Sequence, residues 1–195
     1  MTGEERPVAV LLAGGLARRF GGGDKALCLF RGRPLLAHVV ERMRPQARAL
    51  VLNANGDPSR FAAWGLPVVA DPLPGNPGPL AGVLAGMLWT RTNFPDCRFV
   101  LSVPTDTPFL PPNLAARLGA AGGLACAASA GRLHPVVAVW PVALADRLAA
   151  DLAAGARKVE VWAGRAGAVE VEFPSDPVDP FFNVNRPDDL RSAAC

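Results

Sequence analysis

A segment rich in glycine and positive charge follows the first apolar run of the chain. Residues 12–25 read LAGGLARRFGGGDK and hold five glycines together with Arg18, Arg19 and Lys25. Glycine lets the main chain approach a ligand closely and turn its N–H groups toward an anion, which the three cations would help to neutralise. The composition therefore favours binding of a polyphosphate, and the alternative is a flexible turn with solvated charges.

Two familiar phosphate-binding motifs fit this segment poorly. A P-loop needs a serine or threonine after its lysine, whereas Lys25 is followed by Ala26, so no hydroxyl is placed for a metal ion. Residues 21–26 match G-x-G-x-x-A, but they do not lie in the tight turn directly after the apolar run, where a dinucleotide-binding domain has this pattern. An NAD-dependent oxidoreductase has only this weak match in its favour.

Polar residues also follow the next two apolar runs. Asn53-Ala54-Asn55 come after residues 49–52, and Asp71 comes after residues 67–70. Carboxamides both donate and accept hydrogen bonds, which suits the edge of a base or a ribose, although asparagine is equally common in ordinary turns. Asp71 could cap the following helix, but the proline- and glycine-rich stretch 72–79 separates it from that helix.

A fourth apolar run, residues 99–103, leads into Asp106. A carboxylate at the end of a central strand is well placed for Mg²⁺, which takes one or two protein carboxylates and completes its shell with phosphate and water. Near the end of the sequence, Asn183 and Asn185 flank Val184. On a strand these two asparagines would face the same side.

The order of the predicted elements explains why these positions matter. Apolar runs alternate with segments of helical spacing, which indicates an α/β fold whose mainly parallel sheet is covered by helices on both faces. Ligands of such sheets bind outside the carboxyl ends of the strands. We expect strands at 8–13, 49–52, 67–70, 99–103, 124–129, 136–140, 168–173 and 182–184, and helices at 35–43, 58–64, 80–92, 111–121, 142–154 and 188–193.

Composition sets the broad class. The chain has 195 residues, 50% of them hydrophobic and 19% charged, which excludes a disordered protein and favours one domain over residues 1–195. The net charge of +3 is spread along the chain, so no nucleic-acid partner is expected. The longest apolar stretches fall short of the roughly 18 residues of a membrane span. Four distant cysteines form no C-x-x-C pair, so we expect reduced thiols and a cytoplasmic protein.

Neither histidine completes a hydrolytic or zinc site by its spacing. His38 lies in a predicted helix and is interpreted as structural, whereas His134, before Pro135, fits a functional and a structural role equally. No Ser-His-Asp or Cys-His set can be assembled from the sequence.

Several of these segments, taken in order, resemble the molybdenum cofactor guanylyltransferases, the MobA family. The resemblance spans nearly the whole chain and rests on LLAGGLARRFGGGDK, NAN, DPLPGNPGPLAG, VPTDTPFLPPNL, His134-Pro135 and FNVNRPDDL. The first loop and GPLAG are shared with other nucleotidylyltransferases of the fold, whereas the combination of GG-x-DK and N-V-N is more specific to the guanylyl enzymes. Phe20 and Thr105 depart from the usual methionine and cysteine, at positions interpreted as packing.

The resemblance implies a three-layer αβα, Rossmann-like nucleotidyltransferase fold and a Mg²⁺-dependent reaction. Enzymes of this family join the GMP part of GTP to the terminal phosphate of molybdenum-loaded molybdopterin and release pyrophosphate. By position, the resemblance assigns catalytic roles to Lys25, Arg19 and Asp106, the metal to Asp106, and substrate contacts to Leu12, Ala13, Gly14, Gly15, Lys25, Asn53, Asp71, Asp106, Asn183 and Asn185.

This chemistry agrees with the missing nucleophile and base, because the attacking phosphate oxygen is already anionic at neutral pH. The work would be positioning and charge neutralisation. The resemblance further implies handover proteins that exchange the unstable pterin, and we expect a monomer. Two other functions stay open: a cytidylyltransferase of the same fold, and a nucleotide-binding regulator without catalysis.

Overall fold

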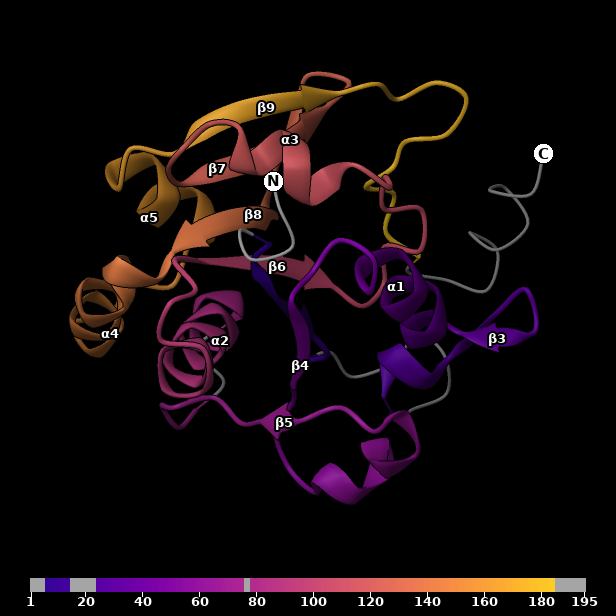
Figure 1. The fold of residues 1–195 in the computed structure, drawn as a ribbon, viewed down its shortest axis with the longest axis horizontal. Coiled ribbons are helices and arrows are strands. Elements are labelled where there is room, and N and C mark those ends of the chain that lie inside the picture. The colour runs from indigo at the N-terminus through magenta and orange to yellow at the C-terminus, as the bar shows by residue number, and fades with distance from the viewer. Residues whose placement is uncertain (1–5, 15–23, 76–77, 185–195) are drawn as a thin grey trace.

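A single twisted sheet forms the centre of the protein. The computed structural model describes residues 6–14, 24–75 and 78–184. Seven strands pair in the order β5-β4-β1-β6-β8-β7-β9 (Figure 1). Their bounds are Val8–Leu12 (β1), Ala49–Asn53 (β4), Val68–Val69 (β5), Phe99–Pro104 (β6), Ala125–Ser129 (β7), Arg132–Pro141 (β8) and Val169–Phe173 (β9).

Most of the sheet is parallel, as predicted. β1 pairs in parallel with β4 and β6, β4 with β5, and β7 with β9. β8 runs antiparallel to both of its neighbours, β6 and β7. The carboxyl ends of β5, β4, β1 and β6 therefore lie together at one edge of the sheet.

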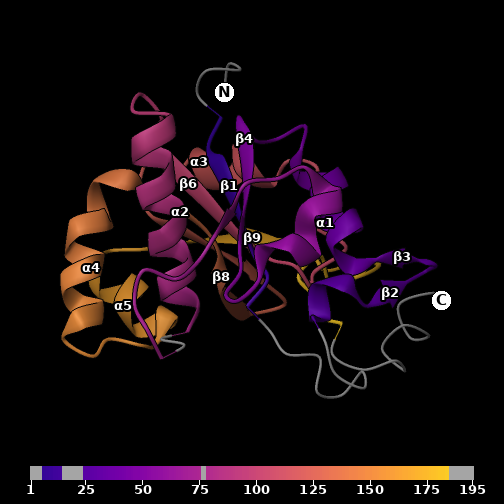
Figure 2. The same cartoon turned by 90° about the horizontal axis from the view of Figure 1, so that it is seen from below.

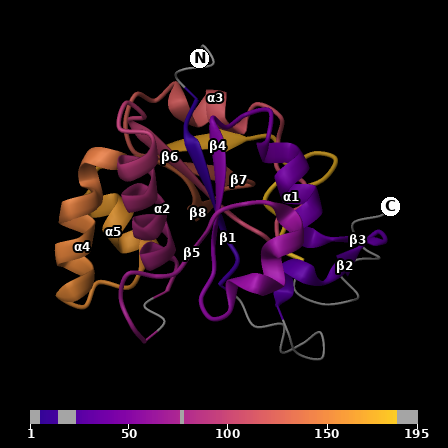
Figure 3. The same ribbon diagram turned by 60° about the horizontal axis from the view of Figure 1, so that its bottom comes forward.

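Helices cover both faces, which confirms the three-layer αβα architecture. α2 (Pro79–Asn93), α4 (Ala145–Ala153) and α5 (Val159–Arg165) lie on one side, and α1 (Leu35–Met43) lies on the other (Figure 2). The short hairpin of β2 (Leu29–Phe30) and β3 (Arg33–Pro34) is next to α1 (Figure 3). α3 (Leu114–Gly119) packs into the same core as α1.

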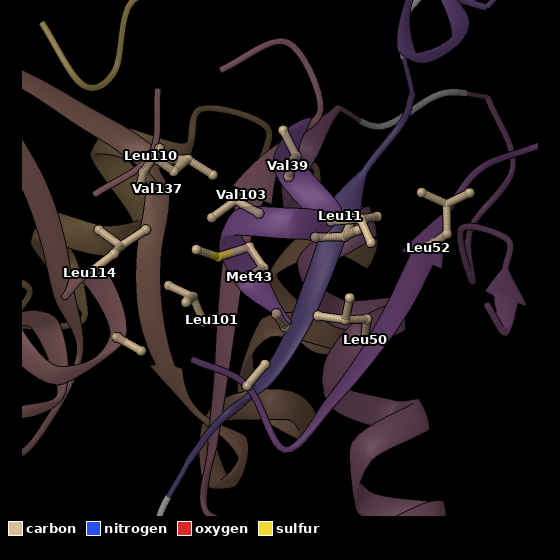
Figure 4. Packing of buried hydrophobic residues seen from close by; sticks show 14 of the residues in the cluster. Leu11, Val39, Met43, Leu50, Leu52, Leu101, Val103, Leu110, Leu114 and Val137 are labelled. Carbon is tan, nitrogen blue, oxygen red and sulfur yellow. The ribbon is translucent and has the colours of Figure 1, made fainter. Parts of the chain in front are cut away.

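Two hydrophobic cores follow from the alternation of side chains along the strands. Ala9 and Leu11 of β1 face the core shared with α1 and α3, whereas Val8 and Val10 face the core under α2, α4 and α5. Figure 4 shows the first core, in which Leu11 lies among side chains of β4, β6 and α1. Strands that are buried on both faces read as continuous apolar runs, as they do in this sequence.

Several predicted elements change in the structure. The segment Pro58–Trp64 is a 3-10 helix (η4), capped by the side chain of Asp57, and the helix expected at 111–121 is reduced to α3. The segment 182–184 forms no strand, so that prediction was wrong. The helix expected at 188–193 lies outside the described residues. Among the described residues, no helix has the length and apolar character needed to cross a membrane.

Candidate functional site

Four of the predicted site residues end or follow adjacent strands at one edge of the sheet. Leu12 pairs in register with Asn53 on one side and with Pro104 on the other. Asp71 lies two residues beyond β5, and Asp106 lies two residues beyond β6. The sequence prediction placed these groups at strand ends, and the parallel register brings those ends together.

Asn53, Asn55 and Asp71 form one hydrogen-bonded unit. The amide of Asn53 donates to Asp71 Oδ1 at 2.9 Å and to the carbonyl of Val69 at 3.2 Å. The amide of Asn55 donates to Asp71 Oδ2 at 2.7 Å, and Asn55 Oδ1 accepts from the main-chain N–H of Asp71 at 2.8 Å. The unit is rigid because both ends of Asn55 bind the same residue. The carboxylate keeps acceptor capacity for further donors.

Helix α2 closes directly over this unit because Gly82 has no side chain. A Cβ atom at Gly82 would lie 2.6 Å from Leu12 Cδ2 and would also collide with the side-chain oxygen of Asn53. One turn along the helix, Gly86 allows the same approach to Val10. The GPLAG segment noted in the sequence thus fixes the distance between α2 and the strand ends.

Lys25 and Asp106 meet across the site. Lys25 Nζ lies 2.5 Å from Asp106 Oδ2, and both side chains are less than one fifth exposed. The second carboxylate oxygen, Asp106 Oδ1, is buried and accepts no hydrogen bond from the described residues. A buried anionic oxygen of this kind is costly to leave without a partner.

The residues around Asp106 fit a cation that takes most of its ligands from phosphate and water. In the described part of the chain, no three His, Cys, Asp or Glu residues gather into a metal site built from protein alone. Mg²⁺ needs only one or two carboxylates and takes phosphate and water for the rest. Asp106 Oδ1 therefore suits the metal role that the sequence suggested.

Arg60 links the unit of Asn53, Asn55 and Asp71 to the segment that carries Lys25, and the sequence analysis did not predict it. Its guanidinium Nε lies 2.6 Å from Asp24 Oδ2, and Nη2 donates to the carbonyl of Asn55 at 2.5 Å. Nη1 donates to the carbonyl of Asp57, also at 2.5 Å. No spacing in the sequence points to this residue, because its place depends on how η4 packs.

The first loop can be described only at its two ends. Ala13 donates its N–H to the carbonyl of Asn53 at 2.9 Å, and the carbonyl of Leu12 accepts from the N–H of Thr105 at 3.2 Å. These groups hold the neighbouring strands together, whereas Gly14 is exposed. The predicted site residues Gly15 and Arg19 lie outside the described residues.

The C-terminal segment reaches the site through the main chain of Asp106. The N–H of Val184 donates to the carbonyl of Asp106 at 2.9 Å, and Asn183 beside it is exposed. The structure thus brings Asn183 near the predicted metal ligand. The expectation that a strand orients it was wrong, and Asn185 lies outside the described residues.

His134 belongs to a polar cluster at the end of β7. Ser129 Oγ donates to Asp179 Oδ1 at 2.8 Å and lies 2.8 Å from His134 Nε2. A hydroxyl that donates to Asp179 accepts from the histidine, so the network assigns the proton to Nε2. Ser129 lies between the other two residues, an order in which the aspartate does not orient the histidine, unlike in a hydrolytic triad.

The αβα fold agrees with that of a nucleotidyltransferase, and the family model and the relatives given below assign the chain to this class. A solved structure with this fold is molybdopterin-guanine dinucleotide biosynthesis protein A from Archaeoglobus fulgidus. It has a TM-score of 0.72 and 24% identity, and the match covers 95% of this chain and 96% of that one. The model of the MobA-like NTP transferase domain matches residues 9–166, and the chain belongs to this family.

Two relatives named molybdenum cofactor guanylyltransferase extend the match to nearly the full length. The protein from Rhodopseudomonas palustris (strain BisB5) is 54% identical over 191 residues, which cover 95% of this chain and 91% of the relative. The protein from Bradyrhizobium sp. (strain ORS 278) is 52% identical over 190 residues, covering 94% and 90%. The family predicted from the sequence is confirmed.

Proposed function

We propose that the protein transfers GMP from GTP to the terminal phosphate of molybdenum-molybdopterin and depends on Mg²⁺. The pairing of Lys25 with Asp106, whose buried second oxygen accepts no hydrogen bond from the described residues, is the observation that carries this proposal. The names of the two relatives support the guanine nucleotide and the pterin acceptor.

The reaction needs no base on the protein. An anionic oxygen of the pterin's terminal phosphate attacks the α-phosphorus of GTP and forms the new P–O bond. The bond from the α-phosphorus to the bridging oxygen of the β-phosphate breaks, and pyrophosphate leaves with that electron pair. The protein must hold the reacting groups in line and neutralise charge that develops on the leaving oxygen.

Lys25 and Asp106 divide the task of neutralising charge. The ammonium of Lys25 would stabilise the departing pyrophosphate, and Asp106 would hold Mg²⁺ through Oδ1, the oxygen that the ammonium does not bind. The ion, when bound, would polarise phosphate oxygens beside the reacting phosphorus. Arg19 and Gly15 would add to the phosphate contacts from the first loop.

The unit of Asn53, Asn55 and Asp71 would bind the nucleoside. Both amide protons of Asn53 are already donated, to Val69 and Asp71, so this side chain shapes the wall of the site. Asp71 keeps lone pairs that can accept hydrogen bonds from the ribose hydroxyls. Leu12, Ala13 and Gly14 would border the nucleotide, and Asn183 with Asn185 would lie toward the pterin.

One assay separates the candidate functions. The protein is supplied with Mg²⁺, molybdopterin-bearing protein and either GTP or CTP, and both pyrophosphate and the pterin-linked nucleotide are measured. We expect pyrophosphate and a guanine dinucleotide with GTP alone. Turnover with CTP alone would contradict the guanine assignment, and binding without pyrophosphate release would favour a regulator.

The proposal extends to the protein's surroundings. A pterin cofactor that is unstable when free favours direct transfer between a monomeric, cytoplasmic enzyme and handover proteins. Light scattering of the purified protein tests the monomer, and a dimer mass would contradict it. If a dialysis membrane separates the enzyme from the handover protein and cofactor transfer is undiminished, direct handover is contradicted.

A further inference from the structure

Arg60 makes three polar contacts: with Asp24, beside Lys25, and with the main chain of Asn55 and Asp57. It lies in η4, whose Phe61 is fully buried in the core shared with α1, so the helix is firmly seated. The Arg60 guanidinium also covers the ring of Phe61 at 4.8 Å from the centroid. This packing directs the guanidinium toward Asp24 and Asn55.

Two of the three contacts of Arg60 lead to a predicted substrate group one step away. Asp24, the ion-pair partner of Nε, directly precedes Lys25 in the chain. Asn55, whose carbonyl accepts from Nη2, binds the carboxylate of Asp71 through its side chain. A polar path therefore runs from Asp71 through Arg60 to Lys25.

We propose that Arg60 is a positioning residue that sets Lys25 relative to the nucleoside side of the site. The inference rests on the proposed function for its effect on turnover. Arg60 touches no predicted substrate group and acts through Asp24, which begins the short turn Lys25–Leu27 that carries the lysine. Without the guanidinium, the turn loses its ion pair, and the main chain that carries Lys25 loses its link to Asn55 and hence to Asp71.

The residue type matches this role. Arginine presents its donors in a rigid planar fork, so one side chain can bind three acceptors that lie in different directions. A lysine at this position would offer a single ammonium and could not bridge Asp24 and Asn55 together. The two side chains of the ion pair are partly shielded, with 28% of Arg60 and 18% of Asp24 exposed.

Arg48 provides a matched control at the opposite edge of the sheet. It precedes β4, pairs with Asp96 at the same 2.6 Å, is 27% exposed and lies over a phenylalanine ring, that of Phe94, at 5.0 Å. Arg48→Ala therefore removes an arginine with a similar ion-pair distance, exposure and ring contact, but remote from Lys25. Any effect on stability that is common to such a loss will appear in both variants.

The first experiment measures hydrogen exchange of the turn in full-length Arg60→Ala and Arg48→Ala. The N–H groups of Leu27 and Cys28 close this turn by donating to the carbonyls of Asp24 and Lys25. We expect their exchange to speed up about tenfold in Arg60→Ala, because the turn loses its partly shielded ion pair with Arg60 and the guanidinium no longer ties Asp24 to the carbonyl of Asn55, and to stay unchanged in Arg48→Ala. Equal exchange in the two variants would overturn the proposal, whatever the enzyme's substrate is.

The second experiment measures pyrophosphate release from GTP. We expect kcat/KM of Arg60→Ala to fall about tenfold to a hundredfold at a Tm similar to that of Arg48→Ala. Added guanidinium ions should restore part of it, and Arg60→Lys should not. An Arg60→Ala enzyme as active as Arg48→Ala would overturn the proposal, whereas an inactive wild type would contradict the proposed function alone.

Discussion

Lys25 and Asp106, which are 81 residues apart in the chain, approach to 2.5 Å in the structure. Their meeting depends on β1 and β6 being parallel neighbours, since Lys25 follows β1 in the chain and Asp106 follows β6. Each side chain thus offsets the other's charge at the edge where phosphates would bind. Nucleotide binding would require the ammonium to turn from the carboxylate toward the phosphates.

Replacing Lys25 by alanine should lower kcat about 10²–10³-fold, the usual loss for one donor that stabilises a transition state. The rate is measured as pyrophosphate release at saturating GTP. The chain has one other lysine, Lys158, which is exposed before α5, and Lys158→Ala should keep the wild-type rate. A near-wild-type rate for Lys25→Ala would remove the ammonium from the mechanism.

Asp106→Asn should abolish Mg²⁺-dependent turnover, because the amide keeps the size of the carboxylate but loses the charge on Oδ1. Titration calorimetry with Mg²⁺ and a non-hydrolysable GTP analogue should show no metal binding. Asp96→Asn, a change at an exposed aspartate paired with Arg48, serves as the control and should leave both readouts intact. Full activity of Asp106→Asn at ordinary Mg²⁺ concentrations would contradict the metal assignment.

The parts of the site that could be predicted are those fixed by strand order. Leu12, Asn53, Asp71 and Asp106 each follow or end an apolar run, and parallel pairing places all such ends at one edge. Arg60 could not be found in this way. Its contacts depend on the packing of Phe61 and on the direction in which η4 leaves β4, and neither has a sequence pattern.

Some elements escaped prediction because tertiary packing outweighs local preference. α5 reads VEVWAGR, whose alternating valines favour a strand, yet burial of Val159 and Trp162 against the second core selects a helix. β8 begins at Arg132, before Pro135, although proline usually interrupts central strands. The pairing of β7 shifts register between Cys126 and Ala127, opposite this proline.

Gly82→Ala should destabilise the protein by about 1–3 kcal/mol, the usual cost of overpacking. The new Cβ would press on Leu12 and on the carboxamide of Asn53, so the KM for GTP should rise as well. Gly164→Ala in α5 meets nothing within 4 Å and should be neutral or stabilising by up to about 1 kcal/mol. Urea unfolding measures the stability of both variants, and equal stability would refute the close approach of α2.

The cluster at His134 predicts how stability depends on pH. Burial lowers the pKa of His134 below its usual value, and nearby Arg132 adds to the effect, while Asp179 and Glu172 oppose it. The ring of Phe181 lies 4.9 Å from the imidazole and contributes to this burial. The folded protein therefore favours the neutral histidine.

Stability should therefore fall as the solution is acidified below about pH 6.5, the ordinary pKa of histidine. In that range the unfolded chain binds more protons at His134 than the folded chain, so each step toward acid favours unfolding. The contribution is fully present above pH 6.5 and is lost as pH falls through the lowered pKa. We expect the free energy of unfolding, measured with urea between about pH 7 and pH 5, to change less steeply with pH in His134→Gln than in the wild type. Parallel slopes would show that the His134 proton is not linked to folding.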